Sequence, residues 1–303
     1  MTRRKTVVIT GCSSGFGRCT ALELARHGWL VFATVRKEED RASLLQEAVS
    51  QQYQGTIMPL LCDITNTEQV ARLAYEVQKL LRKEVLETSQ LQHLSQVTTV
   101  PPLDALVNNA GTAYGAPIEI LPLDDLRAQL EVNVVAHVGV IQAFLPMLKA
   151  AQGTIINVSS ISGRLATPAL GAYCASKFAL EGLSEALRLE LLPFGVRVVL
   201  IEPASSPTDI WKTSLQRSMD NLGRQLESSP YARLLHMAIK SAERSSKRGF
   251  PPQLFAALVV KILSSRRPRA RYCVPGSATA IILLRRFLPD GIWDRLIRSM
   301  MDW

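Results

Sequence analysis

A tyrosine and a lysine stand four residues apart at Tyr173 and Lys177, in a segment of helical pattern. Residues at this spacing lie on the same face of a helix, about 6 Å apart. A free phenol has a pKa of about 10, too high for efficient proton transfer at neutral pH, and a neighbouring cation favours the phenolate. The pair therefore predicts a general acid/base with a lowered tyrosine pKa. Taken alone, the same spacing also occurs on surface helices without any chemical role.

Two more polar residues stand where they could join this pair. Ser160 follows the apolar run Thr154–Val158 and precedes Tyr173 by 13 residues. A hydroxyl at the carboxyl end of a central strand lies where open α/β sheets bind ligands. Asn133 stands in an otherwise apolar helical stretch, so its amide needs a partner such as a backbone carbonyl or a trapped water.

A glycine-rich loop follows the first apolar run and directly precedes a helical pattern. Gly11 permits the tight turn, Gly15 lets the backbone approach a pyrophosphate, and Gly17 lets helix and strand pack closely. The helix N-terminus adds free N–H groups and a partial positive charge. The loop predicts dinucleotide binding, with Ser13 and Ser14 as hydroxyl donors.

The end of the second apolar run indicates which dinucleotide binds. An acidic residue there would accept hydrogen bonds from the adenosine ribose and favour NAD. The chain instead has Arg36 and Lys37, with no carboxylate before Glu38. Arginine forks onto a 2′-phosphate and lysine adds a point charge, so the sequence predicts NADP(H). The alternative is that both residues only cap a surface turn.

Seven short apolar runs predict the strands that position these residues. The runs are almost continuously apolar, which indicates strands buried on both faces of a parallel sheet. Their strict alternation with amphipathic segments predicts one doubly wound α/β layer. The predicted strands are Thr6–Thr10, Leu30–Val35, Ile57–Cys62, Leu103–Val107, Thr154–Val158, Val196–Ile201 and Arg271–Val274. The predicted helices include Gly17–His27, Thr67–Lys83, Leu123–Ala150 and Ala172–Leu192.

We expect residues 1–303 to form a single domain, because α/β folds of this size often do. The cofactor-binding half covers about 1–150, and the catalytic and substrate-binding half about 151–303. Residues 82–102 predict a lengthened helix and a surface loop, the alternative being a partner-docking element. Residues 204–252, after the sixth strand, predict a substrate-binding flap.

Four motifs in order make the chain resemble the short-chain dehydrogenase/reductase family over about residues 5–300. The loop from Thr10 to Gly17 resembles the family's TGxxxGxG, and the residues from Asn108 to Gly111 resemble its NNAG. The YxxxK pair and its distance from the preceding serine also match. The residues that match the family's catalytic tetrad are Asn133, Ser160, Tyr173 and Lys177.

The resemblance implies a Rossmann-type fold with a parallel seven-stranded sheet and a role for each tetrad member. Tyr173 would exchange a proton with the substrate oxygen, Ser160 would hydrogen-bond that oxygen, and Lys177 would hold the nicotinamide ribose and lower the phenol pKa. Asn133 would anchor the water of a proton relay, and Asp63 would meet the adenine. The implied cofactor-binding residues are Gly11, Ser13, Ser14, Gly15, Phe16, Gly17, Arg36, Lys37, Asp63, Ile64, Asn109, Ala110, Gly111, Tyr173, Lys177, Pro203, Ser206 and Thr208.

The chain departs from the family pattern after the sixth strand. The family usually has Pro-Gly there, followed by a threonine, and this chain keeps Pro203 and Thr208 but has Ala204 in place of the glycine. A positive φ at Ala204 would be strained. We expect the loop to lie differently, with Pro207 stiffening it.

The flap and the catalytic segment resemble family members that act on steroids and retinoids, which implies a small apolar substrate. Apolar flap residues predict a ligand pocket, and the alternative is that they pack the flap onto the core. These residues are Trp211, Leu215, Met219, Leu222, Leu226, Tyr231, Leu234 and Leu235.

Composition bears on partners and location. The net charge of +9 comes with basic clusters but no aromatic interleaving or zinc-finger spacing, so we expect no nucleic-acid partner. The five cysteines and four histidines are scattered, which predicts no metal site and a reducing, cytoplasmic setting. The basic, apolar tail 281–297 favours packing on the domain or on a second subunit over the alternative of a membrane surface.

Taken together, the sequence predicts an NADP(H)-dependent oxidoreductase that interconverts a carbonyl and an alcohol. The resemblance also implies a homodimer or homotetramer. One alternative is a biosynthetic enzyme on the same scaffold that catalyses a redox-neutral step such as epimerisation, dehydration or cyclisation. A second alternative is a non-catalytic NADP(H)-binding protein. The presence of all four tetrad residues argues against it.

Overall fold

The computed structural model describes residues 3–88, 100–208, 210, 213–214, 229–247 and 249–301. Part of the predicted segment 82–102 and most of the predicted flap lie outside these ranges. Among the flap residues named above, Trp211, Leu215, Met219, Leu222 and Leu226 fall outside the described residues.

Seven parallel strands form one sheet in the order β3-β2-β1-β4-β5-β6-β7. The order reverses between β1 and β4, the point at which sheets of this kind bind ligands beyond their carboxyl ends. The predicted strand number, direction and layering are confirmed. The strands are β1 (Thr6–Ile9), β2 (Leu30–Val35), β3 (Thr56–Leu61), β4 (Ala105–Asn108), β5 (Thr154–Val158), β6 (Arg197–Pro203) and β7 (Arg271–Val274).

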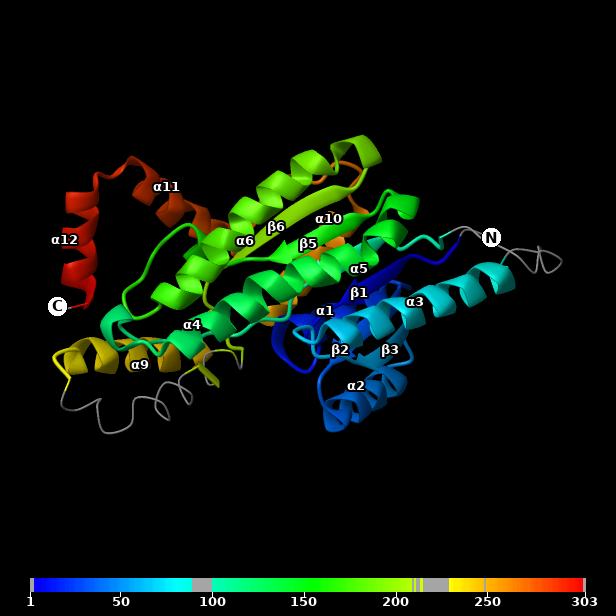
Figure 1. Cartoon of the computed structure of the whole chain (residues 1–303), viewed down its shortest axis with the longest axis horizontal. Helices are drawn as coiled ribbons and strands as arrows, with labels where there is room; N and C mark the ends of the chain where they lie inside the picture. The colour runs from blue at the N-terminus through cyan, green and yellow to red at the C-terminus, as the bar shows by residue number, and fades with distance from the viewer. Residues whose placement is uncertain are drawn as a thin grey trace.

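Helices cover both faces of the sheet because successive strand residues face opposite sides. In β1, Val7 and Ile9 belong to one core and Val8 belongs to the other. The first face carries α1 (Gly15–Arg26), α2 (Glu38–Ser50) and α10 (Pro252–Ser264), and the second carries α3 (Thr67–Thr88), α5 (Ala136–Ala151) and α6 (Gly171–Glu190) (Figure 1).

The predicted helix Leu123–Ala150 is one continuous helical stretch of three parts. These are α4 (Leu123–Leu130), a π-helical turn at Glu131–Val135 and α5. The stretch Leu123–Ala151 is long and apolar enough to cross a membrane. In the structure Val140, Ile141 and Phe144 are buried in the second core, as expected for a core helix of an α/β layer.

The remaining helices gather at one end of the molecule (Figure 1). They are α9 (Ala232–Lys247), α11 (Thr279–Phe287) and α12 (Asp290–Met301). Short 3₁₀ turns occupy Ile118–Ile120 (η1), Ile161–Gly163 (η3), Leu192–Phe194 (η4) and Gly276–Ala278 (η5). The tail predicted to pack does so in part, because Ile282 and Trp293 are buried against Leu165.

Candidate active site

A cavity of about 650 Å³ opens at the carboxyl ends of the strands. It extends from the glycine-rich loop, past the end of β4, to the N-terminal part of α6. The predicted site residues that line it are Gly11, Ser13, Ser14, Gly15, Phe16, Arg36, Asp63, Ile64, Asn109, Ala110, Gly111, Ser160, Tyr173, Lys177, Pro203, Ser206 and Thr208. Three predicted residues, Gly17, Lys37 and Asn133, do not line it.

The glycine-rich loop has the backbone shape that its glycines permit. Gly11 and Gly15 adopt φ of 72° and 56°, a region that side chains rarely enter. A Cβ on Gly17 would lie 2.2 Å from the Gly11 carbonyl oxygen, so this glycine packs the helix under the loop instead of lining the cavity. The first turn of α1 has no acidic residue and no side-chain cap, which leaves its N–H groups for an anion.

Aromatic and amide side chains hold this loop in place. The Phe16 ring stacks on Phe250 and Phe255, with ring centroids 5.6 and 4.3 Å away. Asn109 Nδ2 donates to the carbonyl oxygens of Thr10 and Gly11 at 2.9 and 3.0 Å. The predicted cofactor residue Asn109 therefore also clamps the end of β4 to the phosphate loop.

The end of β2 presents a cation to the cavity. Arg36 is exposed, lines the cavity and, within the described part of the chain, makes no ion pair. Lys37 is the residue before α2 and does not line the cavity. Asp63, across the cavity, accepts hydrogen bonds from the Thr65 N–H and hydroxyl at 3.0 and 2.8 Å.

Tyr173 is buried against Ser160 at the inner end of the cavity. Burial raises the pKa of the phenol to about 12, although a hydrogen bond with Ser160 lowers it. The predicted direction of this pKa shift is wrong for the structure, because desolvation of the phenolate outweighs the neighbouring polar groups. The phenol is therefore protonated at neutral pH.

Lys177 is buried beside Tyr173, with Nζ 5.8 Å from the centre of the Tyr173 ring. The ammonium donates to the Val158 carbonyl oxygen at 2.9 Å, which ties α6 to the end of β5. Burial lowers the pKa of Lys177 to about 8, while the carboxylate of Glu181 raises it. Tyrosine and lysine thus share one helix face, as their spacing predicts.

Asn133 lies behind the cavity wall, in the π-helical turn between α4 and α5. Its Oδ1 accepts from the Thr112 N–H at 2.9 Å, and its Nδ2 donates to the Thr112 carbonyl and the Ser176 hydroxyl, both at 3.0 Å. Its amide therefore hydrogen-bonds both the backbone of Thr112 and a side chain of α6. A backbone carbonyl is one of the two kinds of partner that the sequence predicted for Asn133. π-Helical turns often occur at functional sites.

The departure at Ala204 does not strain the loop. Within the described residues, only Gln52, Gln152 and Ala169 combine a side chain with positive φ. The Ala204 N–H donates to the Val274 carbonyl at 2.8 Å, so the chain simply continues alongside β7. Ala204 therefore avoids the positive φ that would strain it.

The outer part of the cavity contains residues that the motifs did not predict. Leu235, Ala238 and Ile239 of α9 line it, as do residues 167–170 before α6. Of the apolar flap residues in the described part, Leu235 lines the cavity, whereas Tyr231 hydrogen-bonds Glu119 at 2.6 Å. The strong amphipathicity of α9 was the available signal.

Comparison with known proteins identifies relatives in sequence and fold. A family model described as short chain dehydrogenase matches residues 5–218. The chain is 32% identical over 294 residues to an NADPH-dependent 3-dehydrocapnine reductase of Ornithobacterium rhinotracheale, covering 95% of this chain and 94% of that one. It is 32% identical to retinol dehydrogenase 5 of Homo sapiens, covering 96% and 87%. A short-chain dehydrogenase/reductase from Burkholderia phymatum in complex with NAD superposes with a TM-score of 0.75 at 24% identity, covering 94% and 95%.

Proposed function

Because the chain belongs to the short-chain dehydrogenase/reductase family, we propose that it is an NADP(H)-dependent oxidoreductase that reduces a carbonyl group of a small apolar substrate. The family membership itself carries the reaction class. The observation that supports the chemistry is the burial of Tyr173, Ser160 and Lys177 together at one end of a cavity that the phosphate loop also lines.

NADP(H) fits the residues present, and when bound it would supply the hydride. Gly11, Gly15 and the first turn of α1 would hold the pyrophosphate, and Arg36 would meet the 2′-phosphate. Lys177 would hold the nicotinamide ribose. Tyr173 would donate its proton to the substrate oxygen, and Ser160 would stabilise the charge that develops there.

An apolar substrate suits the outer cavity, whose α9 wall consists of Leu235, Ala238 and Ile239. Two relatives carry the names 3-dehydrocapnine reductase and retinol dehydrogenase. We also propose one domain over the chain, a cytoplasmic location and a homodimer or homotetramer. Exposed apolar side chains at Phe178, Leu189 and Leu192 would suit a subunit contact.

The test is oxidation of NADPH and NADH, followed by nicotinamide absorbance, against a panel of apolar ketones and aldehydes. We expect turnover with NADPH and a loss of kcat of about 100-fold or more in Tyr173→Phe, since the proton donor is removed. The exposed Tyr75 offers a matched control, and Tyr75→Phe should leave turnover unchanged. Full turnover in Tyr173→Phe would refute the proposed mechanism.

A further inference from the structure

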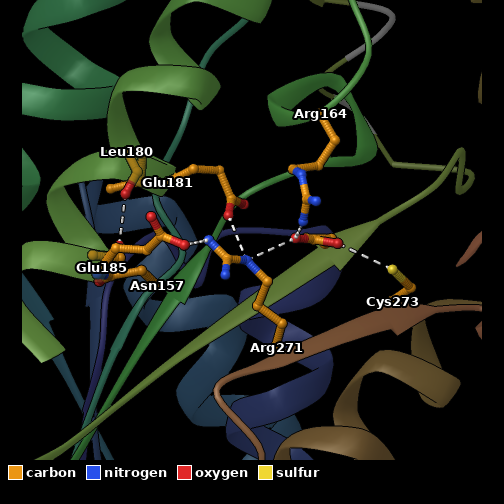
Figure 2. A network of polar contacts seen from close by, with 9 residues as sticks. Asn157, Arg164, Leu180, Glu181, Glu185, Arg271 and Cys273 are labelled. Carbon is orange, nitrogen blue, oxygen red and sulfur yellow. Dashed lines mark hydrogen bonds and ion pairs between the residues drawn. The ribbon is translucent and has the colours of Figure 1, made fainter. Parts of the chain in front are cut away.

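A partly buried network of charged side chains lies where α6, β6 and β7 meet (Figure 2). Arg271 of β7 is at its centre. Its Nε lies 3.0 Å from Glu181 Oε2 and 3.3 Å from Glu202 Oε1, and its Nη2 lies 2.8 Å from Glu185 Oε1. Arg164 approaches Glu202 Oε1 at 3.1 Å from the turn after β5.

Two of these carboxylates are out of reach of solvent. The side chains of Glu181 and Glu202 are 7% and 2% exposed, whereas that of Glu185 is 55% exposed. Buried charges are costly unless they are paired, so an arrangement of this kind needs a compensating role or an exact charge balance. The third Glu202 contact is the Cys273 thiol, which donates to Oε2 at 3.0 Å.

Gly163 packs between Glu181 of the network and the backbone of Lys177. A Cβ at Gly163 would lie 2.8 Å from Ser159 Oγ, 3.0 Å from Glu181 Cγ and 3.1 Å from the Lys177 carbonyl oxygen. Three side-chain and backbone groups therefore meet at a position where there is room only for glycine. Glu181 also follows Lys177 by one helical turn on the same face of α6.

The two buried carboxylates, Glu181 and Glu202, face two cations, Arg271 and Arg164. Lys177 is a third buried cation and lies one helical turn before Glu181 on α6. We propose that Glu181, fixed by Arg271, is a positioning residue that keeps the Lys177 ammonium charged and in place for the nicotinamide ribose. This inference rests on the function proposed above.

The groups that face these two side chains support an electrostatic role. Around Lys177 are Tyr173 on α6 and His137 on α5, whose pKa burial and the Lys177 charge lower to about 4, so that the imidazole is neutral. The remaining charged neighbour is Glu181, and its carboxylate raises the pKa of Lys177. Around Glu181, burial and Glu202 raise the pKa of the carboxyl, whereas Ser159 and Arg271 lower it.

The test compares the pH dependence of kcat/KM and of NADPH affinity in Glu181→Gln and Arg271→Gln. Glutamine keeps the size of Glu181 but removes the negative charge that favours the Lys177 ammonium. The fall of kcat/KM and of NADPH affinity at alkaline pH, here called the alkaline limb, should therefore begin about one pH unit lower. Loss of the Arg271 cation should move the limb in the same direction, because Arg271 fixes Glu181 and favours its charged form. A merely structural role would lower activity without shifting the limb.

Two variants serve as controls. Glu181→Asp keeps the charge and should restore a nearly wild-type limb, and Glu185→Gln removes the exposed Arg271 partner and should not move it. An unmoved limb in Glu181→Gln, or equal shifts in Glu181→Gln and Glu185→Gln, would overturn the inference. Should Glu181→Gln not fold, an unmoved limb in Arg271→Gln would overturn the inference, and a downward shift would support it.

The proposed function and the role of Glu181 can be tested independently of each other. If the wild-type protein has no Tyr173-dependent turnover, the reaction is wrong. The pH dependence of NADPH binding, measured by nicotinamide fluorescence without a carbonyl substrate, then still reports the Lys177 charge. A Glu181→Gln protein that binds NADPH with the wild-type pH dependence would refute the inference alone.

Discussion

Lys177 and Tyr173 occupy one helix face, yet burial acts on them in opposite directions. It raises the pKa of the phenol to about 12 and lowers that of the ammonium to about 8. Desolvation disfavours whichever form is charged, which is the phenolate for one residue and the ammonium for the other. At neutral pH the pair therefore consists of a neutral phenol and a lysine near its titration point.

The first prediction concerns the pH profile of carbonyl reduction. Because the phenol stays protonated to high pH, the group that titrates first is Lys177, and kcat/KM should fall as the pH rises through about 8. Lys177→Arg keeps a cation at all accessible pH values. The kcat/KM that remains in this variant should therefore not fall as the pH rises through about 8. A wild-type plateau that extends well beyond the pKa of Lys177 would contradict the assignment.

The second prediction concerns Arg36, the cation at the end of β2. Arg36→Asp should weaken NADPH binding by about 10- to 100-fold, the loss of a charge-assisted contact to phosphate. NADH binding should weaken much less, since it lacks that phosphate. Lys37→Asp is the matched control, because Lys37 does not line the cavity and its charge acts from farther away. Equal losses for both cofactors would contradict the 2′-phosphate role.

At the scale of elements, the site depends on how closely β1 and α1 approach each other. Gly17 has space for hydrogen alone, since a Cβ would lie 2.2 Å from the Gly11 oxygen and 2.6 Å from Asn109 Nδ2. Both of those atoms belong to the clamp that holds the phosphate loop on β4. Helix placement and cofactor binding are therefore coupled.

The third prediction follows from this coupling. Gly17→Ala should lower the free energy of unfolding by about 1–3 kcal/mol, the usual cost of overpacking, and weaken NADPH binding. Chemical denaturation and nicotinamide fluorescence measure the two effects. Gly139→Ala on α5 is the control, because nothing lies within 4 Å of its Cβ position and alanine favours the helix. Unchanged NADPH affinity in Gly17→Ala would mean that the placement of α1 and cofactor binding are not coupled.

The fourth prediction concerns α9, which forms one wall of the cavity. The Tyr231 hydroxyl, next to its first turn, donates to Glu119 of η1 at 2.6 Å and so links the two sides. Tyr231→Phe keeps the ring packed against the cluster of Ala116 and Leu235 but removes this link. We expect KM for the apolar substrate to rise severalfold with little change in kcat. A changed kcat with unchanged KM would contradict a substrate-wall role.

At the scale of the whole molecule, the sequence was sufficient wherever local patterns determine the structure. Strand β2 and the helix face shared by Tyr173 and Lys177 follow from hydrophobic runs and helical spacing. The Glu181–Arg271 pair does not, because its members are 90 residues apart and meet only when β7 joins the sheet. The Tyr173 pKa shift likewise depends on burial by several elements, and no local pattern reports that.

The last prediction concerns acid stability and depends on His137, buried where α5 meets the end of β4. One ring nitrogen, Nε2, lies 2.7 Å from the Ala110 carbonyl, and Nδ1 has no hydrogen-bond partner among the described residues. Burial and the Lys177 charge lower the pKa of the ring from 6.5 to about 4. Between these values the unfolded chain binds a proton that the folded protein does not, so stability falls as the pH falls.

The size of this effect can be estimated from the shift. With the His137 pKa lowered by this amount, the free energy of unfolding should decrease by about 2 kcal/mol as the pH falls from about 7 to 5. Urea denaturation should show that His137→Gln loses less stability than the wild type over the same interval. The exposed His27 is the control, and His27→Gln should keep the wild-type slope. An identical loss in His137→Gln would mean that other groups carry the acid sensitivity, and that the fold does not lower the pKa of His137.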